Sequence, residues 1–323
     1  MNYRYTLDKR RGRGYIHICP QCGKREFRRY VDNQTMLYIA DTVGKCNREI
    51  KCGYHYPPKD YAKDNPQYYS TYSTTPLRIK KLENVQQEPS FLDARLVPQS
   101  MANNGHINSF TRWLYNVIGK NPKYGVEVVD NLIKKYHLGG SSKMEDAVVF
   151  WQVDIEGNVR TGKMMRYDSK TGKRLKDEGY NYDWVHASLK RQQKINPNFN
   201  MVQCFFGEDQ LKGNEDALYA IFESEKTATT ASAIYPKLIC LATGGLSNLN
   251  VEKCKVLRNR KVIFFPDLGC YSIWKEKVDR IAKEVFFQYY HVDDTLEKNA
   301  TEEEREQGLD LCDYFIKSLN ENK

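Results

Sequence analysis

The fold is decided by the stretch "LYAIFESEKTATTASAIYPKLICLATGG", residues 218–245. A short apolar run ends at Glu223, a segment of small Ala, Thr and Ser residues follows, and a second apolar run ends in two glycines. This order is typical of a strand, a helix and a second, parallel strand. Glu223 is then either a solvated acid at the tip of a strand or a residue that holds a ligand.

The same alternation continues toward the C-terminus. "KVIFFPD" and "FQYYHVDD" are strand-like, "NVEKCKVLRNR" is helix-like, and "SIWKEKVDRIAKEV" is an amphipathic helix pattern. A mostly parallel sheet binds ligands beyond the carboxyl ends of its strands. The sequence places Glu223, the Gly244–Gly245 turn, Asp267 and the pair Asp293–Asp294 at such ends. Converging acids repel one another unless a cation lies between them, so the pattern predicts Mg²⁺.

Composition excludes several classes of protein. The 323 residues are enough for two or three domains, and a hydrophobic share of 40% argues against wholesale disorder. No apolar run approaches the roughly 18 residues that span a bilayer, and the first residues are too polar for a secretory signal. We therefore expect a cytoplasmic protein with no membrane association.

The net charge of +9 is concentrated near the N-terminus. Residues 1–60 hold 13 Lys and Arg against 6 Asp and Glu, a net of +7. A basic module on a nearly neutral body is typical of proteins that bind nucleic acid, although a solvated surface explains the charge equally well.

Four of the nine cysteines lie in this basic segment, at Cys19, Cys22, Cys46 and Cys52. Two such pairs, brought together by a hairpin, form a tetrahedral structural zinc site. Five residues separate the second pair instead of two, so His55 stays open as an alternative ligand. A redox pair is disfavoured because no thioredoxin-like unit surrounds it. We predict a zinc ribbon over residues 1–60 and expect the five scattered cysteines to be reduced.

Basic and aromatic side chains of this ribbon are candidates for nucleic-acid contacts. Cations that could reach phosphates are Arg11, Arg13, Lys24, Arg28 and Arg29. Rings that either stack on bases or form a small core are Tyr15, Phe27, Tyr30 and Tyr54. For any single ring, the core interpretation is favoured.

The middle of the chain divides into a linker and a helical/β module. Residues 61–88 are rich in Tyr, Ser, Thr, Pro and Gln and predict a flexible linker. Residues 89–212 combine a helical hairpin with alternating strands. These strands and turns carry a row of cations that predicts a nucleic-acid groove: Arg160, Lys163, Arg166, Lys170, Lys173 and Arg174. His186 is interpreted as a packed histidine.

Residues 213–323 resemble the Toprim domain of DNA primases and topoisomerases. The resemblance is carried by "FESEKTATTA", "LATGG", "VIFFPDLG" and "GLDLCDYF". It implies that the family's glutamate falls on Glu223, its first aspartate on Asp267, and its late acids on Asp310 and Asp313. The Asp-x-Asp pair is incomplete, because Gly269 stands where the second acid belongs.

The order of zinc ribbon, linker, helical/β module and Toprim domain resembles a DnaG-type primase. The nearest resemblance is to an uncharacterised primase-like family from Bacteroidetes genomes and mobile elements. It implies a multidomain α+β fold with a C-terminal α/β domain. No helicase P-loop is present, so unwinding would need a separate helicase.

The resemblance implies a primase-like nucleotidyltransferase that acts on single-stranded DNA with nucleotide triphosphates. Mg²⁺ or Mn²⁺ held by Glu223, Asp267 and Asp310 would serve the transfer, beside the structural zinc. The other expected site residues are Lys163 and Arg166 on triphosphate or template, Lys226 on a phosphate, and Gly244, Gly245 and Asp313 at the cofactor. Two alternatives remain: a non-catalytic DNA-binding protein with a degenerate site, and, less favoured, a Toprim-type DNA-cleaving enzyme.

Overall fold

The computed structural model describes residues 4–10, 13–66, 88–103, 105–175, 182–307 and 309–321. The chain forms two compact units, one of residues 1–86 with 176–180 and one of residues 87–175 with 181–323. Most of the predicted linker, residues 61–88, lies outside the described residues. Its beginning differs from the prediction, because residues 61–64 belong to a helix. No described helix is both long enough and apolar enough to cross a membrane.

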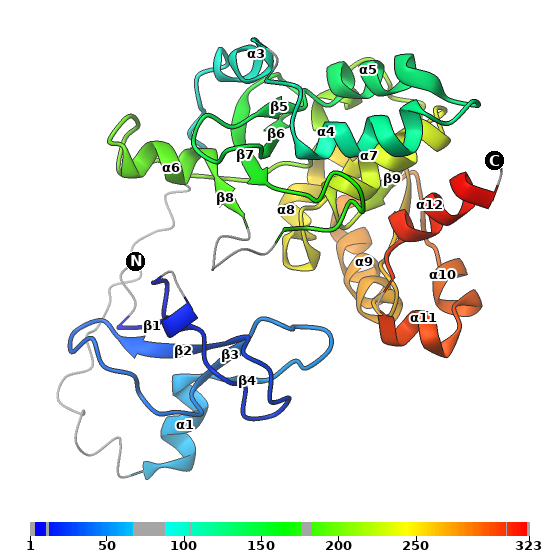
Figure 1. Ribbon diagram of the computed structural model, residues 1–323. Coiled ribbons are helices and arrows are strands. Elements are labelled where there is room, and N and C mark those ends of the chain that lie inside the picture. The colour runs from blue at the N-terminus through cyan, green and yellow to red at the C-terminus, as the bar shows by residue number, and fades with distance from the viewer. Residues whose placement is uncertain are drawn as a thin grey trace. The chain divides into compact units, whose positions relative to one another are not determined.

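The N-terminal unit is a four-stranded antiparallel sheet in the order β1-β2-β3-β4 (Figure 1). Its elements are β1 (Tyr5–Leu7), a 3₁₀ turn (Arg13–Tyr15), β2 (Phe27–Asp32), β3 (Gly44–Cys46), β4 (His55–Tyr56) and helix α1 (Pro58–Asp64). Phe27 is fully buried and packs against Cys19, Cys46 and the ring of Tyr54. The core interpretation is therefore confirmed for Phe27.

The second unit contains a four-stranded antiparallel sheet, ordered β5-β6-β7-β8. Its elements are α3 (Leu96–Met101), α4 (Ser109–Leu114) with a π-helical turn (Tyr115–Gly119), α5 (Gly125–Lys135), β5 (Gly139–Gly140), β6 (Val148–Val153), β7 (Val159–Met165), β8 (Asp183–Trp184) and α6 (Val185–Arg191). Asn108 and Thr111 form a reciprocal capping box at the start of α4. The chain leaves α5 through His137, which adopts a left-handed conformation.

A fully parallel sheet follows, in the order β10-β9-β11-β12. Its strands are β9 (Leu218–Phe222), β10 (Leu238–Ala242), β11 (Lys261–Phe265) and β12 (Tyr289–Val292). The helices are α7 (Glu225–Ile234), α8 (Val251–Cys254), α9 (Tyr271–Val285), α10 (Thr295–Asn299), α11 (Glu302–Gln307) and α12 (Leu311–Glu321), with 3₁₀ turns at Glu208–Leu211, Leu246–Asn248 and Lys255–Leu257. The predicted parallel α/β region is confirmed.

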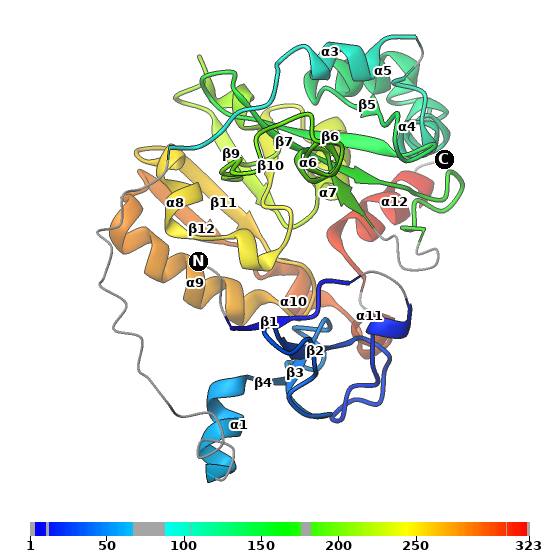
Figure 2. The same cartoon turned by 90° about the vertical axis from the view of Figure 1, so that its left-hand side faces the viewer.

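Helices cover both faces of the parallel sheet (Figure 2). On one face, α9 contributes Trp274, Val278 and Ile281 to a core with Phe264 and Ile221. On the other face lies α7, flanked by α5 and α12. Each fully buried aliphatic or aromatic side chain contributes about 1.5–3 kcal/mol to folding, so this layering fixes the position of the strand ends.

The small residues of α7 let it lie close to the sheet. Ala228 and Ala231 are fully buried, as are the two threonines Thr229 and Thr230. The threonine hydroxyls donate to the carbonyls of Glu225 and Lys226 at 2.8 and 3.0 Å, so no buried hydroxyl is left unpaired there. Ser224 caps the helix by accepting from the Thr227 N–H.

The antiparallel and parallel sheets of this unit share one core. Phe110, Phe150 and Phe206 form a continuous cluster with Ala220 and Phe222 of β9. Residues 89–212 and 213–323, predicted as separate domains, thus pack as parts of one compact unit. The exact domain limits stay predictions.

Candidate functional site

Acids from three segments lie near one another at one edge of the parallel sheet. Glu223 follows β9, Asp267 follows the neighbouring strand β11, and Asp310 lies just before α12. Because β9 and β11 are parallel and paired in register, their carboxyl ends lie side by side. Glu223 and Asp310 lie near enough to Asp267 to influence its charge, but the three acids are not among the described residues whose ligand atoms all lie within 4.8 Å of one another. Their service as a Mg²⁺ site stays a prediction.

The electrostatics of these acids shows their proximity. Burial raises the pKa of Asp267 well above its usual range, and the charges of Glu223 and Asp310 raise it further. Burial also raises the pKa of Glu223, against the lowering effect of the Leu246 backbone N–H and the Trp274 indole. Like charges in a poorly solvated site favour either protonation or a bound cation.

Two buried polar atoms at Glu223 lack a hydrogen-bond partner of ordinary geometry among the described residues. They are the Oε2 atom of Glu223 and the indole Nε1 of the fully buried Trp274. The indole N–H is close enough to lower the pKa of Glu223, but the carboxylate oxygen keeps an unused acceptor. An unsatisfied buried oxygen costs roughly 1–3 kcal/mol, so this atom is suited to accept a ligand.

Asp310 is held by its neighbours. Asp310 and Asp313 each accept a hydrogen bond from the other's backbone N–H at 3.0 Å. Lys226 forms an ion pair with Asp310 at 3.5 Å. Burial lowers the pKa of Lys226, but Cys312, Asp310 and Asp313 outweigh it, so the net shift is upward. Lys226 therefore neutralises the acidic edge instead of presenting a free cation to phosphate.

Lys163 and Arg166, both expected to contact triphosphate or template, lie on opposite sides of the antiparallel sheet, Lys163 in β7 and Arg166 directly after it. Lys163 donates to both carboxylate oxygens of Glu225, at 3.1 and 3.0 Å, in a buried ion pair. Arg166 lines a separate cavity on the other face. Alternation along a strand causes this separation, because residues three apart point to opposite sides. Arg160 is also paired, with Asp154 at 2.7 Å.

Beside this ion pair lies the Gly244–Gly245 turn. Gly244 donates its N–H to the Glu223 carbonyl at 3.0 Å. A Cβ at Gly244, where φ is +77°, would lie 3.2 Å from Glu225 Oε1. The turn thus places backbone next to the Glu225 carboxylate, where a side chain at Gly244 would crowd it.

At the position of the missing second acid, Gly269 contacts Glu297, a residue that sequence reasoning overlooked. Gly269 adopts φ +81°, a conformation that an aspartate would adopt only with strain. Its N–H donates to Glu297 Oε2 at 2.9 Å, while Arg305 binds Glu297 Oε1 at 2.6 Å. Glu297 belongs to α10, 28 residues away, and no spacing signal links the two.

Three further residues near the sheet differ from their expected roles. Asp293 and Asp294 follow β12 as predicted, but they serve local contacts with Thr295 and Lys298. Arg174, counted only in the cationic row, is near enough to lower the pKa of both Glu223 and Asp267. It is exposed and therefore accessible to an anionic ligand.

The N-terminal unit holds a second candidate site, formed by Cys19, Cys22, Cys46 and Cys52. Their Sγ atoms all lie within 4.8 Å of one another. Among the described residues, this is the one set of three or more Cys, His, Asp or Glu ligands that meets that distance. Four thiols in this arrangement fit tetrahedral zinc. His55 is bound to the Tyr30 hydroxyl at 3.0 Å, outside the cluster.

The thiols differ in their surroundings. The Lys24 backbone N–H lowers the pKa of Cys22 to about 7, whereas burial raises the pKa of Cys46 to about 12. Of the ribbon cations, Arg28 donates to backbone carbonyls and Arg29 pairs with Asp41 at 2.7 Å. Lys24 is exposed. Arg11 and the side chain of Arg13 lie outside the described residues.

Two family models match the chain. One describes a zinc beta-ribbon finger and matches residues 3–67, which confirms the predicted zinc ribbon. The other, a domain of unknown function (DUF6371), matches residues 108–268. No curated protein matches.

Solved structures of primases are similar to the chain at low identity. The DnaG primase catalytic domain bound to ssDNA is 14% identical, with 70% of this chain and 80% of that one covered and a TM-score of 0.39. The Aquifex aeolicus primase, comprising zinc-binding and RNA polymerase domains, is 13% identical, with 97% and 80% covered and a TM-score of 0.35. The primase fragment of the bacteriophage T7 primase-helicase is 12% identical, with 86% and 88% covered and a TM-score of 0.32. Similarities at this level assign no function.

Proposed function

We propose that the chain is a primase-like, metal-dependent nucleotidyltransferase that acts on single-stranded DNA. The observation that carries the proposal is the position of Asp267, whose pKa is raised by burial and by the adjacent charges of Glu223 and Asp310. Three carboxylates at the carboxyl edge of a parallel sheet, one with an unsatisfied oxygen, suit Mg²⁺ or Mn²⁺.

Glu223, Asp267 and Asp310 would hold the cation. When bound, it would supply positive charge between the triphosphate of the incoming nucleotide and the attacking 3′ oxygen. Lys226 keeps Asp310 in place and limits the repulsion among the acids. Arg174 would contact a phosphate, because it is exposed and lies near Glu223 and Asp267.

Lys163 takes a different role from the one expected for it. Its ammonium group is committed to Glu225, so it would position α7 and the Glu223 turn instead of binding triphosphate. The zinc ribbon would hold the template strand through its basic surface. A partner helicase and a role in a mobile element stay predictions from the sequence resemblance.

A non-catalytic DNA-binding role is the alternative. It is favoured by Gly269, which leaves the family's acid pair incomplete. Glu297 lies beside Gly269, but it does not replace the missing acid as a metal ligand, because its two oxygens are engaged by Gly269 and Arg305.

Synthesis of primers from labelled nucleotide triphosphates on single-stranded DNA tests the proposal. We expect synthesis that needs added Mg²⁺ or Mn²⁺ and falls at least about 100-fold in Glu223→Gln and Asp267→Asn. Asp294→Asn is the matched control, because Asp294 follows a strand of the same sheet but pairs with Lys298. DNA binding without synthesis, unchanged by these substitutions, would favour the non-catalytic alternative. Cleavage of the DNA would favour the Toprim-type DNA-cleaving enzyme.

A further inference from the structure

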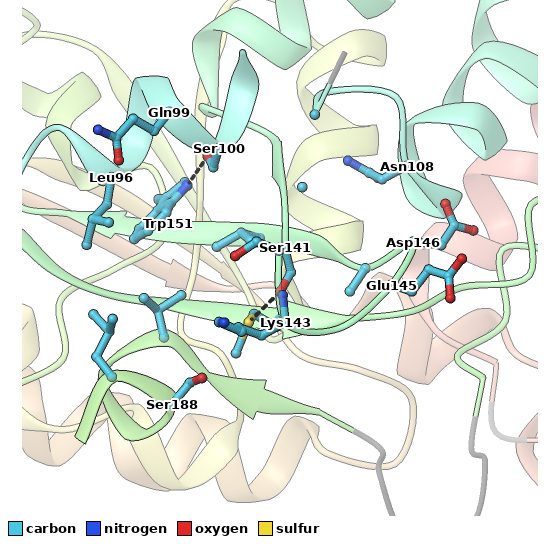
Figure 3. A pocket seen from close by; sticks show the side chains of 18 of the residues that line it. Leu96, Gln99, Ser100, Asn108, Ser141, Lys143, Glu145, Asp146, Trp151 and Ser188 are labelled. Carbon is cyan, nitrogen blue, oxygen red and sulfur yellow. Dashed lines mark hydrogen bonds between the residues drawn. The ribbon is translucent and has the colours of Figure 1, made fainter. Parts of the chain in front are cut away.

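A large cavity lies on the face of the antiparallel sheet that is turned away from Lys163. Its volume is about 870 Å³, and it lies between α3, the segment 140–147, strands β6 and β7, and α6 (Figure 3). Trp151 and Met164 point into it, whereas Phe150 and Lys163 are on the opposite side of the same strands. Ligand sites commonly measure roughly 300–1,000 Å³, so the cavity can hold a small molecule.

The walls of the cavity are held in place by hydrogen bonds. The Trp151 indole donates to Ser100 Oγ at 2.9 Å, and Ser100 donates to the Val97 carbonyl at 2.7 Å (Figure 3). Ser141 Oγ accepts from the backbone N–H groups of Lys143 and Met144 at 3.1 and 3.0 Å. These bonds order both sides of the cavity.

The floor of the cavity is apolar. It consists of side chains from two helices and two strands, namely Leu96, Val149, Trp151, Met164, Val185 and Leu189. Gly140 lets two backbone segments of one wall lie close together, since a Cβ there would lie 2.5 Å from the Gly105 carbonyl oxygen. Such a surface suits a flat, apolar body of the size of a nucleobase.

Cationic side chains in the lining favour a ligand that carries negative charge. Lys143 and Lys194 line the cavity with exposed side chains, and neither forms an ion pair with another described residue. The guanidinium-bearing Arg166 lines it as well. An apolar floor with cations beside it fits a molecule that has a flat ring at one end and a phosphate at the other.

Acids at another part of the lining limit the ligand's length. Glu145 and Asp146 lie together there (Figure 3), and Asp146 is bound by Arg112. A nucleic-acid strand that ran through the cavity would carry phosphates past the exposed Glu145 carboxylate, which repels them. The charge distribution therefore favours a ligand whose phosphate ends inside the cavity.

We propose that this cavity binds a mononucleotide, at a site separate from the acidic edge of the parallel sheet. The site does not depend on the proposed transferase activity, because it shares none of the residues Glu223, Asp267 and Asp310. A nucleotide bound there would act as an effector of the protein and not as a substrate.

Isothermal titration with AMP and with ATP, without added divalent cation, tests this proposal on the zinc-loaded full chain. We expect saturable binding that weakens about tenfold or more in Lys143→Ala/Lys194→Ala. Gln99→Trp, an exposed position in the lining, should block binding by filling the cavity. Lys120→Ala is the matched control, because this exposed lysine lies outside the cavity, and it should bind as the wild type does.

Asp267→Asn separates the two sites, since it should bind AMP normally even where it abolishes synthesis. Absence of saturable binding of either nucleotide to the folded wild-type chain would overturn the proposal. So would binding that persists unchanged in both the lysine double variant and Gln99→Trp. A single-stranded oligodeoxynucleotide that binds more tightly than AMP, with the same sensitivity to the lysines, would overturn the assignment to a mononucleotide.

Discussion

Glu208 is a buried carboxyl group that couples the stability of the fold to pH. It begins the 3₁₀ turn Glu208–Leu211 and accepts a hydrogen bond from the Phe205 N–H at 3.0 Å. Burial raises its pKa to about 7, although that hydrogen bond and the charge of Arg160 oppose the rise. In the folded chain, Glu208 therefore stays protonated at pH values where the unfolded chain has already lost this proton.

We predict that Glu208→Gln stabilises the protein at high pH and not at low pH. The contribution of the protonated carboxyl is complete below about pH 4.5 and is lost as the pH rises to about 7. Glutamine keeps the acceptor for Phe205 but has no proton to lose, so its advantage grows to about 2–3 kcal/mol across this interval. Urea unfolding of both proteins over a pH series measures the difference. Parallel stability curves would contradict the prediction.

Individual site residues differ in how far the sequence could predict them. Glu223, Asp267 and Asp310 follow apolar runs or a family motif, and in the structure Glu223 and Asp310 lie near enough to raise the pKa of Asp267. Glu297 reaches Gly269 through a tertiary contact across 28 residues, which no local pattern encodes. The commitment of Lys163 to Glu225 was likewise hidden, because it depends on how β7 packs against α7.

The zinc ribbon is the element whose stability depends most on a ligand. Its core cluster consists of Phe27, Cys19 and Cys46, and the other buried apolar side chains among its described residues are Val31, Val43 and Ala62. This is too little apolar area to hold a fold of this size by itself. We predict that Cys46→Ser loses zinc and makes this unit sensitive to protease. His55→Ala should retain zinc, because His55 lies outside the cysteine cluster. Metal analysis and limited proteolysis give both readouts.

The opposite pattern would contradict the four-cysteine site. If His55→Ala lost zinc while Cys52→Ser kept it, histidine would be the fourth ligand, which was the alternative left open by the spacing of the second pair.

The contact between β7 and α7 depends on a buried ion pair. Lys163 is 9% exposed and Glu225 2% exposed, so neither charge is solvated when its partner is removed. We predict that Glu225→Ala lowers the free energy of unfolding by about 3–5 kcal/mol. The double variant Lys163→Met/Glu225→Met should recover most of this loss, because no charge then remains buried. Denaturant titration of the single and double variants measures this coupling, and additive losses would contradict it.

At the scale of elements, periodicity predicted most of the structure. Alternation of apolar runs with helix-length segments predicted the parallel sheet. The turn at Glu156–Gly157 joins the antiparallel strands β6 and β7, whereas the turn at Thr171–Gly172 closes a single bridge between Tyr167 and Arg174. Helix ends were less predictable. After α5, the left-handed conformation is adopted by His137. Gly139 lies two residues further on, although glycine is the residue that adopts this conformation most easily.

The second unit as a whole is organised around two sheets that share a core. Phe150 and Phe206 on the antiparallel side contact the cluster that holds Ala220 and Phe222 of β9. This arrangement leaves opposite faces of the antiparallel sheet for different uses, with Lys163 toward the parallel sheet and Arg166, directly after β7, toward the cavity. The sequence predicted cations along these strands but could not assign them to faces, because the sheet packing decides which face is buried.

The central claim is that Glu223, Asp267 and Asp310 form a site for a divalent cation. Titration of the zinc-loaded protein with Mn²⁺, followed by electron paramagnetic resonance of the free ion, tests it most directly. We predict saturable Mn²⁺ binding by the wild type and by Asp294→Asn, and loss of that binding in Glu223→Gln and in Asp267→Asn. Absence of binding in the wild type, or equal binding in all four proteins, would contradict the claim.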